Sequence, residues 1–450
     1  MKTHLIRNLG GLLLLSSLLL LPVGCNDDRD LFYDSPLASN YASESITAWF
    51  DLALDLIQTT PGVSPPVAAR ALGYMGVTAY EAVASGFPGH NSLAGQLTDL
   101  QPGDLPAPDR EQQYHWPSVV NGALALVVEY LFFNAAPEGQ YQIASLNSRI
   151  ENRFRKEVDL QTHQRSLQHG KQLGEAIISW ATQDTIGHQG QLKNFPAGYI
   201  RPTGPDKWTP TGPQVIPLQP YWGKARTFVP NCASMTQPPA PLPFSEMPSS
   251  AFYQEAMTVY TALNEHAGEK KIIAEYWADG GGTITPPGHS VSIALQLVRK
   301  EKLNLAETAK LMAQLGMAVN DAFVSCWFCK FQFNLLRPQS YIQKYIDPNW
   351  SPLLPTPPFP EYTSGHSTQS GAASVILTAV FGENFRFQDN THLDRTDING
   401  KPRDFSSFQH AAQEAAVSRL YGGIHYPMGN EQGLSQGVSV GREVLKLRFE

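Results

Sequence analysis

Lys330 and Arg337 open the first of three short segments near the C-terminus whose residue types could bind and transform an anion. They are seven residues apart, a spacing that returns to nearly the same face of a helix. No acidic residue stands at i+3 or i+4 to neutralise either cation. Pro338 is expected to end that helix and to turn the backbone of Arg337 away from α geometry. Such a pair favours an external anion, although a solvated helix face is the simpler explanation of this segment alone.

Ser364, Gly365 and His366 form the second segment, directly before an alanine-rich helical run. At the start of a helix, Ser364 and Gly365 would present a hydroxyl and backbone N–H groups at the positive end of the helix dipole, which suits a tetrahedral anion. His366 could then exchange protons with that anion. On its own, a capped turn with an incidental histidine explains the segment equally simply.

The third segment holds Arg419 and His425, separated by the pair Gly422 and Gly423. An unbroken helix would place the arginine and the histidine on different faces. The glycine pair permits a turn that re-aims the histidine, so the two side chains could address one ligand.

The elements that must position these segments are helical. The chain has 450 residues, 42% of them hydrophobic and 16% charged, which is typical of a globular protein. Apolar residues recur with helical period over several runs, whereas strand-like alternation is rare. We expect helices at 46–57, 64–80, 118–133, 141–154, 164–180, 249–263, 270–278, 305–334, 367–380, 408–421 and 431–447.

Proline and charge define the organisation around those helices. Residues 196–243 hold 12 of the 35 prolines and show no period, so they are expected to form a long surface loop of the kind that often borders a substrate entrance. We predict an N-terminal helical domain at 25–195, a connecting loop at 196–247 and a C-terminal helical domain with the site at 248–450. The net charge of −7 is spread along the chain, which argues against a nucleic acid partner.

The N-terminus resembles a bacterial lipoprotein signal. Residues 1–24 begin with two cations, continue with an apolar run at 12–21, and are followed by Cys25, which would be acylated. Pro22 departs from the usual leucine, so plain secretory cleavage is the alternative. No later run reaches the ~18 apolar residues needed to span a membrane. We therefore expect an exported lipoprotein, periplasmic or on the cell surface, held to the membrane only through Cys25.

Taken in order, Lys-x6-Arg-Pro, Ser-Gly-His and Ser-Arg-x5-His closely resemble the signature of the phosphatidic acid phosphatase type 2 and vanadium-dependent haloperoxidase superfamily. The motifs cover residues 330–425, and helical organisation similar to that of the larger haloperoxidases extends over most of the chain. The resemblance implies an all-α fold of two helical bundles with long proline-rich loops. It also implies a vanadate cofactor, in a site that phosphate could occupy as well.

The roles implied by the resemblance fall on the three segments. His425 would bond to vanadium, or attack phosphorus in a phosphatase. His366 would be the acid–base residue, and Lys330 would also polarise bound peroxide. The groups that would hold the oxygens of the anion are Lys330, Arg337, Ser364, Gly365 and Arg419.

Two aromatic residues favour the haloperoxidase branch. Trp327 lies three residues before the motif lysine and Phe359 seven before the motif histidine, as in the halide pocket of chloroperoxidase-like members. The implied reaction is oxidation of a halide by hydrogen peroxide to hypohalous acid, with iodide or bromide favoured. The alternatives are an acid phosphatase with a phosphohistidine at His425, and a lipoprotein that merely captures anions. No oligomeric state is predicted.

Two features depart from what the resemblance implies. The thiol of Cys329 stands beside Lys330, where an oxidising halogen species would attack it unless it is buried. Gly429 and Asn430 follow His425 where relatives commonly carry a carboxylate, so any salt bridge expected there lacks that partner. Cys326 and Cys329 are interpreted as a structural pair, and His289 as a structural histidine.

Overall fold

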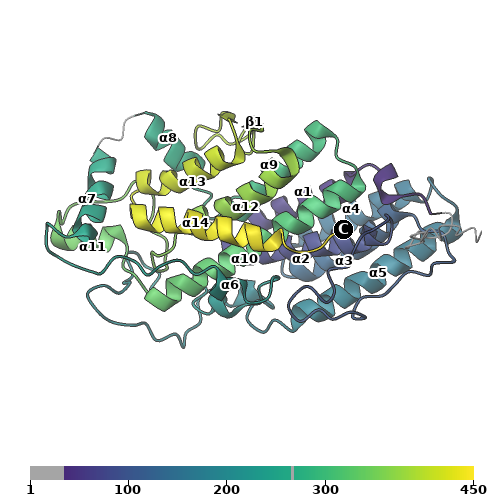
Figure 1. Cartoon of the computed structure of the whole chain (residues 1–450), viewed down its shortest axis with the longest axis horizontal. Coiled ribbons are helices and arrows are strands. Elements are labelled where there is room, and N and C mark those ends of the chain that lie inside the picture. The colour runs from purple at the N-terminus through teal and green to yellow at the C-terminus, as the bar shows by residue number, and fades with distance from the viewer. Residues whose placement is uncertain (1–34, 265–267) are drawn as a thin grey trace, which may run out of the picture.

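The structure, a computed structural model, describes residues 35–264 and 268–450. The expected signal at 1–24 and the acylated Cys25 lie outside the described residues. Figure 1 shows α1–α5 gathered at one end of an elongated molecule, α7 and α11 at the other, and α12 and α14 between them. The described chain is all-α, as predicted. No helix within the described ranges is both long enough and apolar enough to cross a membrane.

The N-terminal helices follow the predicted runs closely, and proline fixes several of their starts. A proline in the first turn costs no hydrogen bond because that N–H has no partner within the helix, and α2, α3 and α4 all begin in this way. The bounds are α1 Glu44–Thr59, α2 Pro65–Ala84, α3 Trp116–Leu131, α4 Pro137–Phe154 and α5 Leu160–Thr182.

The C-terminal part contains two helices that the sequence did not predict, α9 Thr285–Glu301 and α11 Pro338–Tyr345. Both carry proline in their first turn, a residue that otherwise marks a break. A three-residue antiparallel strand pair, β1 Phe387–Asp389 with β2 Arg403–Phe405, was also not predicted. The remaining helices are α6 Cys232–Met235, α7 Ala251–Asn264, α8 Glu269–Tyr276, α10 Leu305–Phe333, α12 Gly365–Phe381, α13 Phe408–Tyr421 and α14 Pro427–Val444.

Helix α10 runs through the centre of the core and packs along α2 and α12. A capping box fixes its start, because the Asn304 side chain accepts from the Glu307 N–H and the Glu307 side chain accepts from the Asn304 N–H. Gly76 lets the α2 and α10 backbones touch, since a Cβ there would lie 2.3 Å from the Met312 carbonyl oxygen. Helices α12 and α14 approach just as closely at Gly437, where a Cβ would lie 1.9 Å from the Thr368 carbonyl oxygen. These contacts set the positions of the ends of α10, α12 and α14.

Residues 196–247 contain only short helical turns, at Trp222–Lys224 and α6, and otherwise run as irregular chain. The segment lies against α10: the Trp327 indole N–H donates to the Leu218 carbonyl at 3.2 Å. The domain boundaries given above remain a prediction, and the large core includes buried residues from both of the predicted helical domains.

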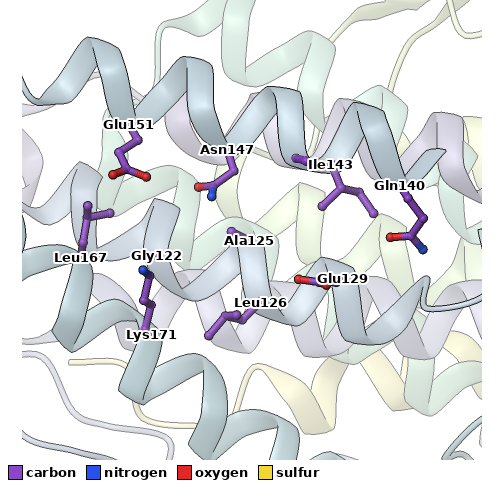
Figure 2. Close-up of a pocket in the computed structure, with 11 residues that line it drawn as sticks. Gly122, Ala125, Leu126, Glu129, Gln140, Ile143, Asn147, Glu151, Leu167 and Lys171 are labelled. Atoms are coloured by element: carbon purple, nitrogen blue, oxygen red, sulfur yellow. The ribbon is translucent and has the colours of Figure 1, made fainter. Parts of the chain in front are cut away.

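A hollow of about 190 Å³ lies between α3, α4 and α5, far along the chain from the three motif segments. Figure 2 shows Asn147 and Glu151 of α4 pointing toward α3 and toward Lys171 of α5. None of the motif residues lines this hollow.

Candidate active site

The junction of α10 and α11 brings Lys330 and Arg337 together in a way that differs from the prediction. Helix α10 ends at Phe333 because Asn334 adopts the left-handed conformation, with φ 51°. Lys330 is therefore in the last turn, whereas Arg337 lies beyond the helix with extended backbone and caps α11. The prediction of one shared helical face was wrong, as was the expectation that Pro338 ends this helix: Pro338 begins α11. The extended backbone of Arg337 itself is confirmed.

Both cations reach the same loop, which leads into Ser364. The Lys330 ammonium is fully buried and donates to the carbonyls of Pro360, Glu361 and Thr363 at 2.9, 2.7 and 2.5 Å. These three bonds use all three of its hydrogens. Burial lowers the pKa of Lys330 to about 8. Lys330 therefore holds the loop through these three hydrogen bonds. To bind a ligand directly, its ammonium group must give up the bond to one of the carbonyls.

The Arg337 guanidinium is fully buried and retains unused bonding capacity. Its Nε donates to the Phe359 carbonyl at 2.8 Å, and its Nη1 donates to the Ile424 carbonyl at 2.8 Å and to His425 Nε2 at 3.1 Å. Its Nη2 has no partner, although it is buried. Burial lowers the pKa of Arg337 to about 10. An unsatisfied buried guanidinium group is costly, and an anion would satisfy it.

Arg419, on the last turn of α13, lies close enough to Arg337 and His425 for its charge to act on them. Its Nε donates to the Ser418 hydroxyl at 3.1 Å, and its Nη2 donates to the Ala274 carbonyl at 3.0 Å. Its Nη1 lies 3.4 Å from His366 Nε2. Burial lowers the pKa of Arg419 to about 10, although the charge of Asp279 acts in the opposite direction.

The start of α12 supplies the predicted helix terminus. Ser364 is the N-cap, and its hydroxyl accepts from the Ser367 N–H. Gly365 and His366 follow in the first turn and are only partly buried, in contrast to Ser364. Burial and the charge of Arg419 hold the pKa of His366 well below its ordinary value. His366 is therefore neutral at pH 7 and available to accept a proton.

His425 follows a turn made possible by Gly423, whose φ is 74°. The turn brings His425 to Arg337, from which its Nε2 accepts, and its action together with Arg419 on one ligand stays a prediction. Its Nδ1 lies 2.7 Å from the Glu361 carboxylate. Burial, followed by the charge of Arg337, holds the pKa of His425 well below its ordinary value.

Trp327 and Phe359 form one aromatic wall beside the cations. Their ring centroids are 5.0 Å apart. The Lys330 ammonium lies 5.2 Å from the Phe359 centroid, and the Arg337 guanidinium carbon lies 4.9 Å from it. Trp327 also lies beside Gly365, since a Cβ at Gly365 would be 3.7 Å from the Trp327 ring.

We call Lys330, Arg337 and Arg419 the cation site. None of the three makes a salt bridge to a carboxylate in the described part of the chain, and their bonding partners are mainly neutral carbonyl oxygens. The three positive charges therefore lie buried beside a helix N-terminus without a direct carboxylate partner. This arrangement suits a multiply charged oxyanion.

Comparison with known proteins identifies the family. The model of the family described as "VCPO second helical-bundle domain" matches residues 310–449 of this chain. Vanadium chloroperoxidase of Curvularia inaequalis is 24% identical, over 86% of this chain and 79% of that protein. The crystal structure of the first bacterial vanadium-dependent iodoperoxidase is 35% identical, with a TM-score of 0.83, over 91% of this chain and 97% of the other.

The chain belongs to the vanadium-dependent haloperoxidase family. A holo-type bacterial vanadium-dependent chloroperoxidase shares the fold at 14% identity, with a TM-score of 0.64, over 85% of this chain and 92% of the other. The protein is thus an enzyme of the peroxidase class, as predicted from the three motifs.

Vanadate, the cofactor of this haloperoxidase family, fits the residues present. The orphaned Nη2 of Arg337 supplies an unused donor, and the three cations supply the charge that balances an oxyanion. The single lone pair of His425 Nε2 accepts from Arg337, and a bond to vanadium would replace that hydrogen bond.

Glu361 is a residue of the haloperoxidase site that the sequence analysis did not single out. Its carboxylate contacts His425, so the carboxylate that is lacking at Gly429 comes from the loop before Ser364. Glu361 belongs to the same loop as Phe359 and the Ser-Gly-His motif, but only the folded chain brings it to His425.

A second polar cluster, which we call the aspartate–histidine network, lies behind Arg419. His289 bonds Asp279 through Nδ1 at 2.8 Å and Asp389 through Nε2 at 2.7 Å, and His392 lies 3.2 Å from Asp279. Tyr276 donates to Asp389 at 2.8 Å. Although burial lowers it, the pKa of His289 is raised to about 10 by the charges of Asp279 and Asp389.

The aspartate–histidine network explains the position of His289. Asp279, His289 and His392 are close enough to share a metal ion, but both nitrogens of His289 already bond carboxylates. His289 therefore has a structural position, as expected. Asp279 supplies the nearby negative charge that acts on Arg419.

The two thiols near Lys330 are buried and unpaired. Cys326 donates to the Thr363 carbonyl at 3.3 Å. Burial raises the pKa of Cys329 to about 12, so it is a protonated and inaccessible thiol. Burial therefore protects this thiol from an oxidising halogen species, so its presence beside Lys330 places no limit on the halide that the enzyme oxidises.

Proposed function

We propose that this vanadium-dependent haloperoxidase oxidises iodide in preference to bromide and chloride, with hypoiodous acid as the product. Iodide is the easiest of these halides to oxidise, and the relative with a TM-score of 0.83 is a bacterial iodoperoxidase. In this reaction iodide gives two electrons to hydrogen peroxide and the O–O bond breaks. One oxygen leaves with iodine, and the other leaves as water after taking up a proton.

The observation that carries the proposal is the buried cation site beside His425, whose three cations make no salt bridge within the described residues. Lys330, Arg337 and Arg419 would hold the oxygens of vanadate, with the Ser364 hydroxyl and the Gly365 N–H completing the cradle. When bound through His425 Nε2, vanadate supplies a Lewis acid that activates hydrogen peroxide toward nucleophilic attack.

The protein's own groups handle the proton and the halide. His366 is neutral and partly exposed, so it would accept a proton from incoming peroxide and return it to the leaving oxygen. Trp327 and Phe359 would line the halide pocket, where the nearby cations favour an anion and the rings exclude water. This aromatic wall is the observation that favours halide oxidation over phosphate ester hydrolysis.

The test is peroxide-dependent oxidation of iodide and bromide by metal-stripped protein in phosphate-free buffer, with and without orthovanadate. We expect activity only with vanadate, and a higher kcat/KM for iodide. Higher activity with bromide would overturn the halide assignment. Hydrolysis of a phosphomonoester, inhibited by vanadate, together with inactivity on both halides would favour the acid phosphatase instead.

We also propose export as a lipoprotein acylated at Cys25, on the basis of the N-terminal sequence. Expressed with its own leader, the protein should partition into detergent and carry a lipid on Cys25 by mass spectrometry. Cys25→Ser should remain in the aqueous phase. A wild-type N-terminus at another residue, without lipid, would support plain secretory cleavage.

A further inference from the structure

Glu361 and Gly429 form a steric pair around His425. The Glu361 side chain is fully buried, and its Oε1 accepts from the Tyr426 N–H at 3.1 Å and lies 2.7 Å from His425 Nδ1. Gly429, in the first turn of α14, lies so close that a Cβ there would be 2.2 Å from the same oxygen. Its φ is not among the positive values, so the available space, and not the backbone, demands glycine.

The hydrogen bonds around His425 define its tautomer. The Arg337 guanidinium has donors only, so His425 Nε2 must accept from it. A neutral imidazole that accepts at Nε2 carries its proton on Nδ1, and that proton points at Glu361 Oε1. Glu361 is in turn held through its main chain, since its N–H donates to the Leu335 carbonyl and its carbonyl accepts from Lys330.

We propose that Glu361 is the positioning residue of this site: it holds the proton of His425 on Nδ1 and thereby presents Nε2 to vanadate, and Gly429 is required to leave room for its carboxylate. This inference rests on the proposed function of His425 as the vanadium ligand. Carboxylates that orient ligating histidines contribute roughly 10- to 100-fold to metal affinity.

The geometry also predicts an exchange. A side chain at position 429 would enter the volume that the Glu361 carboxylate occupies, so a carboxylate could reach His425 Nδ1 from either position, but not from both. Gly429→Ala should therefore displace Glu361 and weaken vanadate binding. The double variant Glu361→Ala with Gly429→Asp should recover binding that Glu361→Ala alone loses.

The experiment measures orthovanadate binding to the full metal-free chain by calorimetry in phosphate-free buffer. We expect Glu361→Ala and Gly429→Ala each to lose about 10- to 100-fold in affinity, and the double variant to regain most of it. Glu361→Gln keeps an oxygen acceptor and should lose less. The matched control is Glu255→Gln, because Glu255 accepts from the Met428 N–H of the same helix end without contacting His425. Circular dichroism checks the folding of each variant.

A second readout needs no cofactor. In metal-free protein labelled with ¹⁵N-histidine, the His425 signals, assigned by comparison with His425→Gln, should be those of the Nδ1–H tautomer. In Glu361→Ala they should move toward tautomer exchange, and in the double variant they should return. Unchanged tautomer and unchanged affinity in Glu361→Ala and Glu361→Gln would overturn the inference. Failure of wild-type protein to bind vanadate would instead contradict the proposed function, while the tautomer experiment would still decide the role of Glu361.

Discussion

The cation site and the aspartate–histidine network are both buried and charged, but they differ in how their charges are paired. In the network, a histidine lies between two carboxylates, and Tyr276 donates to one of them. In the cation site, Lys330 and Arg337 meet carbonyl oxygens, and one guanidinium nitrogen has no partner. Buried charge is costly unless it is paired. The positive charge of the network thus has carboxylate partners within the chain, whereas the cation site would gain its negative partner from a bound oxyanion.

Because of this difference, we expect mutations in the two regions to have different effects on activity and on stability. Changes in the cation site and in its histidines should act mainly on activity, because these groups would bind the oxyanion and transfer its proton. Changes in the network should remove stability first, because each member neutralises another.

The largest effect is expected at His366. Replacement by alanine removes the acid–base group, so kcat should fall roughly 10²- to 10⁴-fold. Steady-state iodide oxidation with saturating vanadate measures the loss. His410→Ala, a change of an exposed histidine on α13, is the control and should retain activity. Equal activity of His366→Ala and wild type would remove His366 from the mechanism.

His289→Ala should lower the free energy of unfolding by about 3–5 kcal/mol, because it leaves two buried carboxylates without their partner. Urea denaturation measures this value. Asp404→Asn is the control. Asp404 lies in β2, which pairs with the strand that carries Asp389, but its side chain is exposed and accepts a hydrogen bond from Gln388. A loss of stability no larger than that of the control would mean that the network is not structural.

Vanadate should stabilise the protein through the cation site alone. At about 100 times its dissociation constant, the ligand should add roughly 2.7 kcal/mol to the free energy of unfolding. His289→Ala should keep this gain, and Arg337→Ala should lose it at any accessible vanadate concentration. Thermal denaturation with and without orthovanadate compares the three proteins. A full gain in Arg337→Ala would contradict the binding role of that guanidinium.

The network should also produce the smaller, pH-dependent effect. The pKa of His289 is raised to about 10 in the folded protein, above its ordinary value of about 6.5. The folded state therefore binds the proton more tightly, and its contribution is complete below pH 6.5 and is lost as the pH rises toward 10. The slope from this group is at most about 1.4 kcal/mol per pH unit. Unfolding experiments from pH 6.5 to 10 should show a smaller decline in His289→Ala, and an identical decline would contradict the assignment.

Local signals in the sequence were sufficient to predict the all-α fold and to single out the motif residues, whose functional roles stay a prediction. Amphipathic period predicted the long helices, and residue type with order predicted Lys330, Arg337, Arg419 and the two histidines. The end of α10 was predicted within one residue, but the new helix that begins just after Arg337 was not, because Pro338 was interpreted as the end of a helix.

The residues that the sequence analysis missed depend on contacts between distant segments. Glu361 acquires its role from His425, 64 residues further along the chain. Likewise, His289 meets Asp389 across 100 residues. Helix α9 was missed because Pro286 and Pro287 suggest a break, although proline is well suited to a first helical turn.

The most direct test of the central claim is a stepwise titration of metal-free protein with orthovanadate, in which bound vanadate and the rate of iodide oxidation are measured at each step. We predict one bound vanadate per chain at saturation, with activity proportional to occupancy and absent at zero occupancy. Iodide oxidation at full rate without vanadate, or saturable vanadate binding that never produces activity, would contradict the assignment of the cation site as the centre of halide oxidation.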